Sequence, residues 1–270
     1  MQPSPAASGR CKPGGRQVIA VQLYTLRSLL DDPARLGGIL GRIREIGYEA
    51  VEVAGLGPKI VDRFGEEMRR AGLKACAVHA GLERLTGEMD VVIDECTEWG
   101  CEFVVVPAVP HSYRSAEGFK RFAAEATAMA RVLRDHGLRL AYHNHAYELE
   151  RFDGRETGLE MLFMWAAGDV LQAELDTYWL QFGGVDPAGW IRRYRDRVPL
   201  VHLKDLAISK GDPVDAEIGE GNLAWPAILK ACRDAGTRWL IVEQDNPRRD
   251  PLEAIANSYR NLKRLVAEAG

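Results

Sequence analysis

The sequence lacks three features that would place the protein in a special class. It has no apolar run long enough to span a membrane, and its first 17 residues contain no apolar run of the kind that a signal peptide requires. The net charge is only −4 at pH 7, which provides no basic field for a phosphate backbone and argues against a nucleic-acid partner. The five cysteines are odd in number and lack metal-ligand spacing, and four of them fall in apolar-periodic stretches. We therefore expect a cytoplasmic protein from a reducing compartment.

A glycine-rich phosphate fingerprint is also missing after the first apolar run, where the sequence reads AVQLYTLR. This disfavours an open, doubly wound dinucleotide-binding sheet. The length of 270 residues suits one α/β barrel or two small domains. We expect residues 1–17, which are rich in proline, glycine and serine, to form a disordered tail, and residues 18–270 to form a single domain.

What the sequence does contain is a repeat of an apolar run, a loop and an amphipathic helix. Most of the runs are almost continuously apolar, as expected for strands that are covered on both faces. Eight such units predict an α/β fold, a closed (β/α)8 TIM barrel. The predicted strands span residues 18–23, 50–54, 73–78, 103–107, 138–142, 170–175, 199–203 and 239–243.

The ends of several helices are also marked in the sequence. Asp32-Pro33 and Asp250-Pro251 each predict a helix that begins with a capping aspartate followed by proline. Glycines such as Gly100 and Gly137 stand just before apolar runs, where a left-handed residue commonly ends a helix.

The last three predicted strands carry, at or near their ends, residues of types that commonly bind metal ions. Asp176 follows the sixth strand, His202 lies in the seventh and Glu243 closes the eighth. In a (β/α)8 barrel these ends meet at one face, where active sites are built. Imidazole and carboxylate ligands suit Mn²⁺, Zn²⁺, Co²⁺ or Fe²⁺, and carboxylates with water suit Mg²⁺. The alternative is that each residue is an ordinary hydrogen-bonded polar group at a strand end.

The fifth strand ends in the densest polar segment, YHNHAYE, which spans residues 142–148. His143 and His145 lie two residues apart and would face the same side of an extended strand. Buried polar groups need partners, so this cluster indicates a ligand or a metal ion, although a hydrogen-bonded structural cluster is the alternative.

Other strand ends add candidate substrate-binding residues. Gln22 and Tyr24 follow the first strand, Glu52 lies in the second, and His79 closes the third. The segment IGEGNLAW, which ends at Trp225, places glycines before a helix. Such amides can bind an anion, although a simple turn explains the glycines equally well.

The motifs YHNHAYEL, ELDTYW, VHLKD, IGEGNLAW and IVEQD resemble the xylose isomerase-like TIM barrel superfamily, the sugar phosphate isomerase/epimerase group. The resemblance runs from Val18 to the C-terminus. The group includes ketose 3-epimerases, sugar isomerases, inosose and dehydroshikimate dehydratases, 3-keto-glycoside lyases or hydratases and endonuclease IV. The YHNH form is closest to the subgroup of inosose dehydratases and keto-glycoside lyases.

The resemblance implies one divalent metal ion held by Glu, Asp, His and Glu from strands five to eight. Asp176, His202 and Glu243 match the last three ligands. His143 stands where the epimerases have the first glutamate, so we expect Glu148 to reach in from the loop, with His143 as the alternative ligand.

Two departures from the family pattern argue against a DNA-repair enzyme. Trp179 stands where the endonuclease and the epimerases have a histidine. The endonuclease also needs a D-x-H pair after the seventh strand, where this chain has HLKD, residues 202–205. We place Trp179 and Trp225 with the substrate-binding candidates.

The resemblance implies a metal-dependent sugar isomerase or epimerase that works by α-proton abstraction and an enediolate. Glu243, His143 or His145 is the candidate base, and Lys204 would stabilise the developing oxyanion. A lyase or dehydratase with the same site, and a non-catalytic sugar-binding barrel, are the alternatives. We expect a small sugar or polyol substrate and no nucleic acid or membrane; a homo-oligomer through the outer helices stays open.

Overall fold

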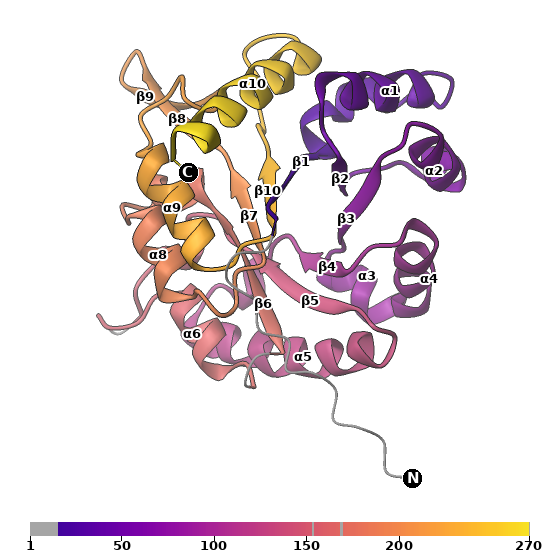
Figure 1. Cartoon of the computed structure of the whole chain (residues 1–270). Helices are drawn as coiled ribbons and strands as arrows, with labels where there is room; N and C mark the ends of the chain where they lie inside the picture. The colour runs from indigo at the N-terminus through magenta and orange to yellow at the C-terminus, as the bar shows by residue number, and fades with distance from the viewer. Residues whose placement is uncertain (1–15, 153, 168–169, 270) are drawn as a thin grey trace.

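A closed ring of eight parallel strands forms the centre of the computed structural model, which describes residues 16–152, 154–167 and 170–269 (Figure 1). Around the ring the order is β1-β10-β7-β6-β5-β4-β3-β2, so the (β/α)8 TIM barrel prediction is confirmed. The eight strands are β1 (Val18–Gln22), β2 (Ala50–Val53), β3 (Lys74–His79), β4 (Phe103–Val106), β5 (Arg139–His143), β6 (Leu171–Asp176), β7 (Leu200–Leu203) and β10 (Trp239–Val242).

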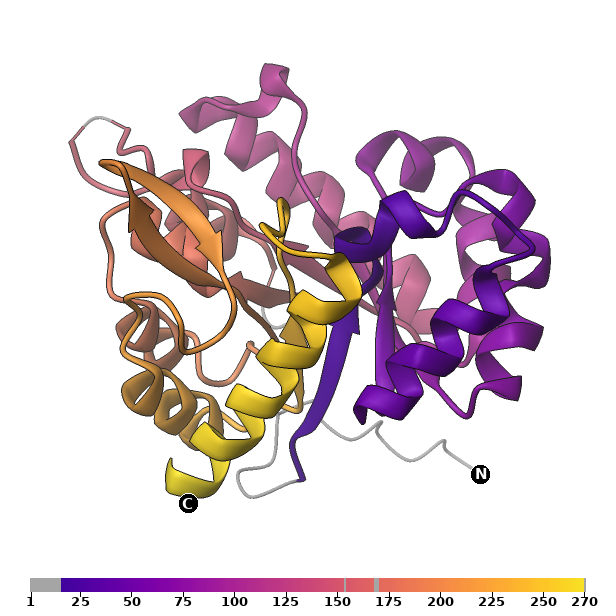
Figure 2. The ribbon, with the colours of Figure 1, turned by 90° about the horizontal axis from the view of Figure 1, so that it is seen from above.

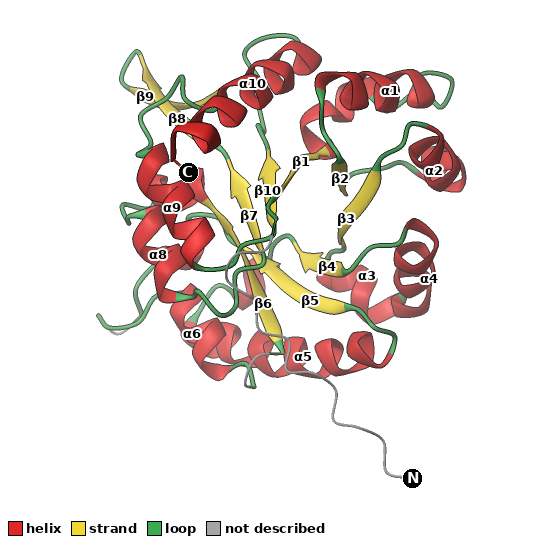
Figure 3. Cartoon of the chain, in the orientation of Figure 1, coloured by secondary structure: helices red, strands yellow, loops and turns green. Residues whose placement is uncertain are grey.

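Helices surround this ring and cover the outer face of every strand (Figure 3). Short 3₁₀ helices follow three of the strands: η1 (Leu23–Leu29), η2 (His111–Tyr113) and η3 (Tyr147–Leu149). The α-helices are α1 (Leu36–Ile46), α2 (Pro58–Arg70), α3 (Leu82–Gly87), α4 (Met89–Trp99), α5 (Ala116–Asp135), α6 (Gly158–Trp165), α7 (Thr177–Phe182), α8 (Pro187–Arg193), α9 (Trp225–Asp234) and α10 (Pro251–Ala269).

The barrel interior divides into an apolar lower part and a polar upper part. Phe103, Leu200 and Trp239 pack with small residues inside the lower ring. Higher up, the inward-facing residues are buried and ionisable, as with Glu52 and His202. Since the apolar layer closes the lower end, the carboxyl ends of the strands, here called the mouth, are the open face of the barrel.

The predicted N-terminal tail lies outside the described residues except for Arg16 and Gln17. Arg16 forms an ion pair with Glu49, and the side-chain amide of Gln17 donates a hydrogen bond to the backbone carbonyl of Thr237 at 3.1 Å. The four described cysteines are buried and free. Within the described ranges, no helix combines the length and apolar character needed to cross a bilayer.

The two Asp-Pro pairs behave differently. Asp250 Oδ1 accepts hydrogen bonds from the amides of Leu252 and Glu253 and caps α10, as predicted. Asp32 instead accepts from the amide of Ala34 in a turn, and α1 begins only at Leu36 without a side-chain cap. The prediction that Asp32-Pro33 opens the first helix is therefore wrong, because the aspartate satisfies a turn amide before the helix starts.

A two-stranded antiparallel hairpin that was not predicted follows β7. It consists of β8 (Asp205–Ser209) and β9 (Asp212–Ala216), and it lies to the side of the barrel strands, at the left in Figure 2. Lys210 and Gly211 form its turn with φ values of 54° and 94°. Positive φ at both central residues is the geometry of the tight turns that match the twist of a hairpin.

Asp205, at the base of this hairpin, organises the loop that leads to α9. Its carboxylate accepts hydrogen bonds from the amides of Gly219, Gly221 and Leu223 at 2.8, 3.1 and 3.3 Å. It also accepts the Trp225 indole N–H at 2.7 Å. A Cβ atom at position 221 would collide with this carboxylate, which explains the glycine there.

Replacing Asp250 with alanine should lower the free energy of unfolding by about 1 kcal/mol, because two amides at the start of α10 lose their acceptor. Asp32→Ala is the matched control and should cost less, since Asp32 caps no helix. Urea denaturation of both variants measures the difference; an equal loss would contradict the assignment of Asp250 as the cap.

Asp205→Ala should destabilise the protein by about 3 kcal/mol or more, because several buried N–H donors would lose one shared acceptor. The amides of Gly219, Gly221 and Leu223 should exchange with solvent faster in hydrogen-exchange measurements. Asp212→Ala, at the exposed tip of the same hairpin, is the control. Unchanged hydrogen-exchange protection of these amides in Asp205→Ala would show that the loop keeps its structure without the Asp205 carboxylate.

Candidate metal centre

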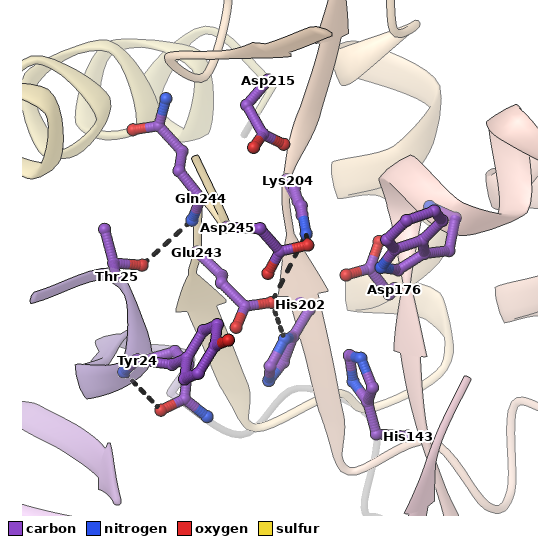
Figure 4. A network of polar contacts seen from close by, with 12 residues as sticks. Tyr24, Thr25, His143, Asp176, His202, Lys204, Asp215, Glu243, Gln244 and Asp245 are labelled. Carbon is purple, nitrogen blue, oxygen red and sulfur yellow. Dashed lines mark hydrogen bonds and ion pairs between the residues drawn. The ribbon is translucent and has the colours of Figure 1, made fainter. Parts of the chain in front are cut away.

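Four side chains from neighbouring strands converge at the mouth. His143 ends β5, Asp176 ends β6, His202 lies in β7 and Glu243 follows β10. These strands are consecutive in the barrel, and the β6–β7 register pairs Asp176 with His202. One potential ligand atom from each of the four residues lies within 4.8 Å of the other three (Figure 4). The structure thus brings together Asp176, His202 and Glu243, and adds His143.

His202 stands at the centre of this group. Its Nδ1 lies 2.9 Å from Glu243 Oε2, while its Nε2 lies 2.5 Å from Glu52 Oε2 and 3.1 Å from Glu174 Oε2. Burial alone lowers the pKa of His202, but the charges of these carboxylates outweigh burial and raise the pKa well above its usual value. The surroundings of His202 therefore favour a positive charge, carried either by a proton or by a metal ion.

A second group of potential ligands lies beside the first and shares two of its histidines. The His79 Nε2 lies 3.0 Å from Glu174 Oε2 and 3.3 Å from Glu52 Oε2. Burial lowers the pKa of His79, but the two carboxylates outweigh burial and raise it to about 10. The members of this second group are His79, His143, Glu174 and His202.

Glu174 is a member that the sequence analysis missed. It is fully buried and pairs with His143 in the β5–β6 register. Burial raises the pKa of Glu174, but the neighbouring imidazoles outweigh burial and lower it to about 2. A signal was present in the sequence: Glu174 lies two residues before Asp176 and so shares its side of the strand.

Several buried oxygens in these groups have no hydrogen-bond partner among the described residues. They are Asp176 Oδ2, Glu174 Oε1 and Glu52 Oε1. Burial raises the pKa of Asp176 to about 7, which reflects the cost of its buried charge. Imidazole nitrogens and carboxylate oxygens with unsatisfied acceptors fit a divalent transition metal ion.

The structure does not place Glu148 in either group. Tyr142 donates its hydroxyl to Glu148 Oε1 at 2.7 Å, and the His145 amide donates to Glu148 Oε2 at 2.9 Å. The geometry therefore favours the alternative ligand His143 over Glu148. The 3₁₀ turn η3 carries Glu148 away from the strand axis and gives each of its oxygens a donor.

The mouth opens into a cavity of about 450 Å³, which suits a small molecule. Among the predicted substrate-binding residues, Tyr24 and His79 line it. Gln22 and Glu52 lie buried, where the Gln22 amide donates to Glu52 Oε2 at 2.8 Å. The residues that line the cavity are Tyr24, Arg27, Ala54, Gly55, His79, Pro107, His143, His145, Glu243, Asp245 and Asn246.

His145 reaches this cavity between two aromatic rings. Its ring centroid lies 5.8 Å from that of Tyr147 and 5.3 Å from that of Trp179. Burial lowers the pKa of His145 to about 4, so the imidazole is neutral at neutral pH. Its buried Nδ1 has no hydrogen-bond partner among the described residues, and it belongs to neither group of potential ligands. Trp179 thus contacts the site through His145.

Lys204 is fully buried behind the residues that line the cavity. Its ammonium forms an ion pair with Asp245 and lies 3.9 Å from Glu243 Oε2. The Tyr178 and Trp179 rings lie 5.2 and 5.1 Å from it. Burial opposes the charge, but the surrounding carboxylates outweigh burial and raise the Lys204 pKa. Lys204 therefore contacts Glu243 and Asp245, which line the cavity, and influences the cavity through their carboxylates.

In the seventh loop, the placement of Trp225 with the substrate-binding residues is not supported, and the simple turn describes the glycines better than the anion site. Trp225 is buried, donates its indole N–H to Asp205 and does not line the cavity. The amides of Gly219 and Gly221, considered above as an anion site, already donate to the same carboxylate. The loop is therefore a turn stabilised by Asp205, because the Asp205 carboxylate accepts the amide hydrogen bonds that a bound anion would otherwise accept.

Known proteins resemble this chain in sequence and in structure. The inosose dehydratase of Lacticaseibacillus casei is 26% identical over 55% of this chain and 53% of its own length, so the chain matches about half of that relative. The inosose dehydratase of Geobacillus kaustophilus is 23% identical, with 83% of each chain covered.

Among solved structures, a sugar phosphate isomerase/epimerase from Parabacteroides distasonis superposes with a TM-score of 0.75 at 23% identity, covering 98% of this chain and 96% of the other. The IOLI protein with a binding zinc atom gives a TM-score of 0.70 at 16% identity, covering 94% and 99%. These likenesses agree with the barrel fold. A family model described as xylose isomerase-like TIM barrel matches residues 40–265 of this chain. The chain belongs to the xylose isomerase-like TIM barrel family.

Proposed function

We propose that this protein is a divalent-metal-dependent enzyme that removes a proton next to a carbonyl group of a sugar or polyol. The observation that carries the proposal is the buried group of His143, Asp176, His202 and Glu243 beside a cavity of about 450 Å³. The relatives named inosose dehydratase and the neighbour named sugar phosphate isomerase/epimerase support a carbohydrate substrate.

The donor set favours a transition metal ion over magnesium. Two imidazoles and two carboxylates suit Mn²⁺, Zn²⁺, Co²⁺ or Fe²⁺, whereas Mg²⁺ prefers oxygen ligands and water. The structural neighbour described with a zinc atom is consistent with this choice. When bound, such an ion supplies Lewis acidity that polarises a carbonyl oxygen and stabilises the charge developing beside it.

In this proposal the residues around the ligands divide the remaining work. His145 accepts the α-proton, because its imidazole lines the cavity and is neutral at neutral pH. Lys204 holds Glu243 and Asp245 in place through its buried ammonium. Glu52 and Glu174 orient His202 by facing its second ring nitrogen.

The reaction class depends on what happens to the substrate after its α-proton has been removed. Return of the proton to another face or carbon gives an epimerase or an isomerase, and departure of a hydroxyl from the neighbouring carbon gives a dehydratase. The relatives named inosose dehydratase favour elimination as the first reaction to assay. Isomerisation or epimerisation of a keto-sugar is the second candidate, favoured by the neighbour named isomerase/epimerase.

Metal binding tests the ligand set directly. Calorimetric titration of the metal-free protein with Mn²⁺ or Zn²⁺ should show one tight site. His202→Ala and His143→Ala should each weaken binding by more than the roughly 100-fold that loss of a supporting group costs. Glu148→Gln is the matched comparison and should keep nearly wild-type affinity, because Tyr142 and the His145 amide hold its carboxylate. Equal losses in Glu148→Gln and His143→Ala would contradict the proposed ligands.

Proton exchange tests the chemistry. Incubation with inososes and keto-sugars in D2O should introduce deuterium into at least one substrate, with loss of water visible by mass spectrometry if the enzyme is a dehydratase. EDTA should stop the exchange, and excess Mn²⁺ or Zn²⁺ should restore it. His145→Ala should slow it by about 10²- to 10⁴-fold without loss of metal affinity.

His136→Ala is the control for this experiment. His136 is exposed at the end of α5, so its loss should leave the exchange rate unchanged. Exchange that persists at the full rate after EDTA treatment would refute the metal-dependent mechanism, and a full rate in His145→Ala would refute the proposed base.

A further inference from the structure

The places where a barrel enzyme would hold a phosphate group are occupied by carboxylates of this chain. In (β/α)8 barrels, phosphate groups commonly bind at the loops after the seventh and eighth strands, to backbone amides and a helix N-terminus. Here those loops follow β7 and β10. Both loops carry aspartates at these positions, Asp205 after β7 and Asp245 after β10.

In the loop after β7, Asp205 takes the amides that an anion would use. Gly219, Gly221 and Leu223 all donate their N–H groups to its carboxylate. The same carboxylate accepts the indole N–H of Trp225, the first residue of α9. A phosphate group would have to displace a buried, multiply hydrogen-bonded carboxylate, so this loop holds no free cradle.

In the loop after β10, two backbone donors are likewise engaged. The Gln244 amide donates to Thr25 Oγ1 at 3.0 Å, and the Asn246 amide donates to Asp215 Oδ2 at 2.7 Å. Asp245 lies between them and projects its carboxylate to the cavity wall (Figure 4). This loop therefore presents negative charge where a phosphate group would need positive charge.

Lys204 and Arg27 carry positive charge near the cavity, and of the two only Lys204 has a carboxylate partner among the described residues. Lys204 is the one buried lysine or arginine among the residues that the structure describes, and Asp245 neutralises it. Arg27 lines the rim, where its Nη1 donates to the Tyr24 carbonyl at 2.9 Å and its guanidinium lies 4.2 Å from the centroid of the Tyr24 ring; these contacts orient the guanidinium and leave its charge in place. Glu243, one of the proposed metal ligands, also lines the cavity.

We propose that the site selects an uncharged ketose or cyclic polyol ketone, and that Asp245 determines this selection by neutralising Lys204 and repelling phosphate and carboxylate groups. The inference rests on the proposed function for the existence of a substrate, but the charge selection itself is a property of the cavity. Hydroxyl groups suit this lining well, because the Asp245 carboxylate at the cavity wall accepts hydrogen bonds.

The experiment is a calorimetric titration of the metal-loaded protein, at low ionic strength, with inorganic phosphate and with D-fructose 6-phosphate. Wild-type protein should bind both weakly. Asp245→Asn keeps the shape of the side chain, frees Lys204, and should bind both at least about tenfold more tightly, with the gain shrinking as salt is added. The double variant Asp245→Asn/Lys204→Met should lose that gain.

Asp212→Asn is the matched control, because it removes one negative charge from the exposed tip of the hairpin at the same end of the barrel. It should behave like the wild type. Equal phosphate affinity in Asp245→Asn and Asp212→Asn would overturn the proposal. So would wild-type protein that binds D-fructose 6-phosphate more tightly than free D-fructose, above all if Arg27→Ala removed that preference.

The wild-type comparison needs no variant to fold, so it tests the proposal even if Asp245→Asn is unstable. The proton-exchange assay separates this proposal from the proposed function. If no uncharged ketose or inosose exchanges its α-proton, the proposed function fails, while a gain in phosphate affinity in Asp245→Asn still supports the charge selection. Exchange that occurs with phosphorylated keto-sugars and not with their free forms overturns the charge selection and leaves the enzyme class intact.

Discussion

The structure of the mouth depends on one constraint: the negative charges buried around His202 must be balanced. Glu52 and Glu174 face one nitrogen of the imidazole, and Glu243 faces the other. Carboxylates this close together and shielded from water destabilise one another unless positive charge lies among them. A central imidazole with carboxylates on both sides meets the requirement when protonated, and a divalent ion bound at the same place meets it with greater charge.

The barrel can hold this concentration of charge because its interior is divided along the axis into an apolar lower part and an ionisable upper part. Phe103, Leu200 and Trp239 fill the lower interior with apolar side chains, which close the ring and exclude water. The upper positions of the same ring carry the ionisable groups. Because inward-facing side chains from different strands of a closed barrel meet inside the ring, residues far apart in the sequence, such as Glu52 on β2 and His202 on β7, come within hydrogen-bonding distance.

The sequence was sufficient to predict the barrel and the convergence of Asp176, His202 and Glu243, because apolar runs mark strands and strand ends share one face. Glu174 was missed because it lies inside an apolar run, although its spacing of two residues from Asp176 places it on the same side of the strand. The sequence also favoured Glu148 over His143, since the direction of a carboxylate in a 3₁₀ turn depends on the Tyr142 hydroxyl that binds it, a contact that no spacing rule reveals.

The hairpin after β7 was missed for a related reason, and it links the fold to the choice of substrate. A short antiparallel pair has no apolar face of its own, so periodicity does not reveal it. Yet its first residue, Asp205, fills the nest of amides before α9, and Asp215 in its second strand anchors the loop that carries Asp245. The hairpin therefore supplies carboxylates that accept hydrogen bonds from amides of both loops, after β7 and after β10. Under the proposed function, a cation held by the four side chains of the candidate metal centre would supply positive charge to this site, and a substrate with a carbonyl oxygen and hydroxyl groups would complement it.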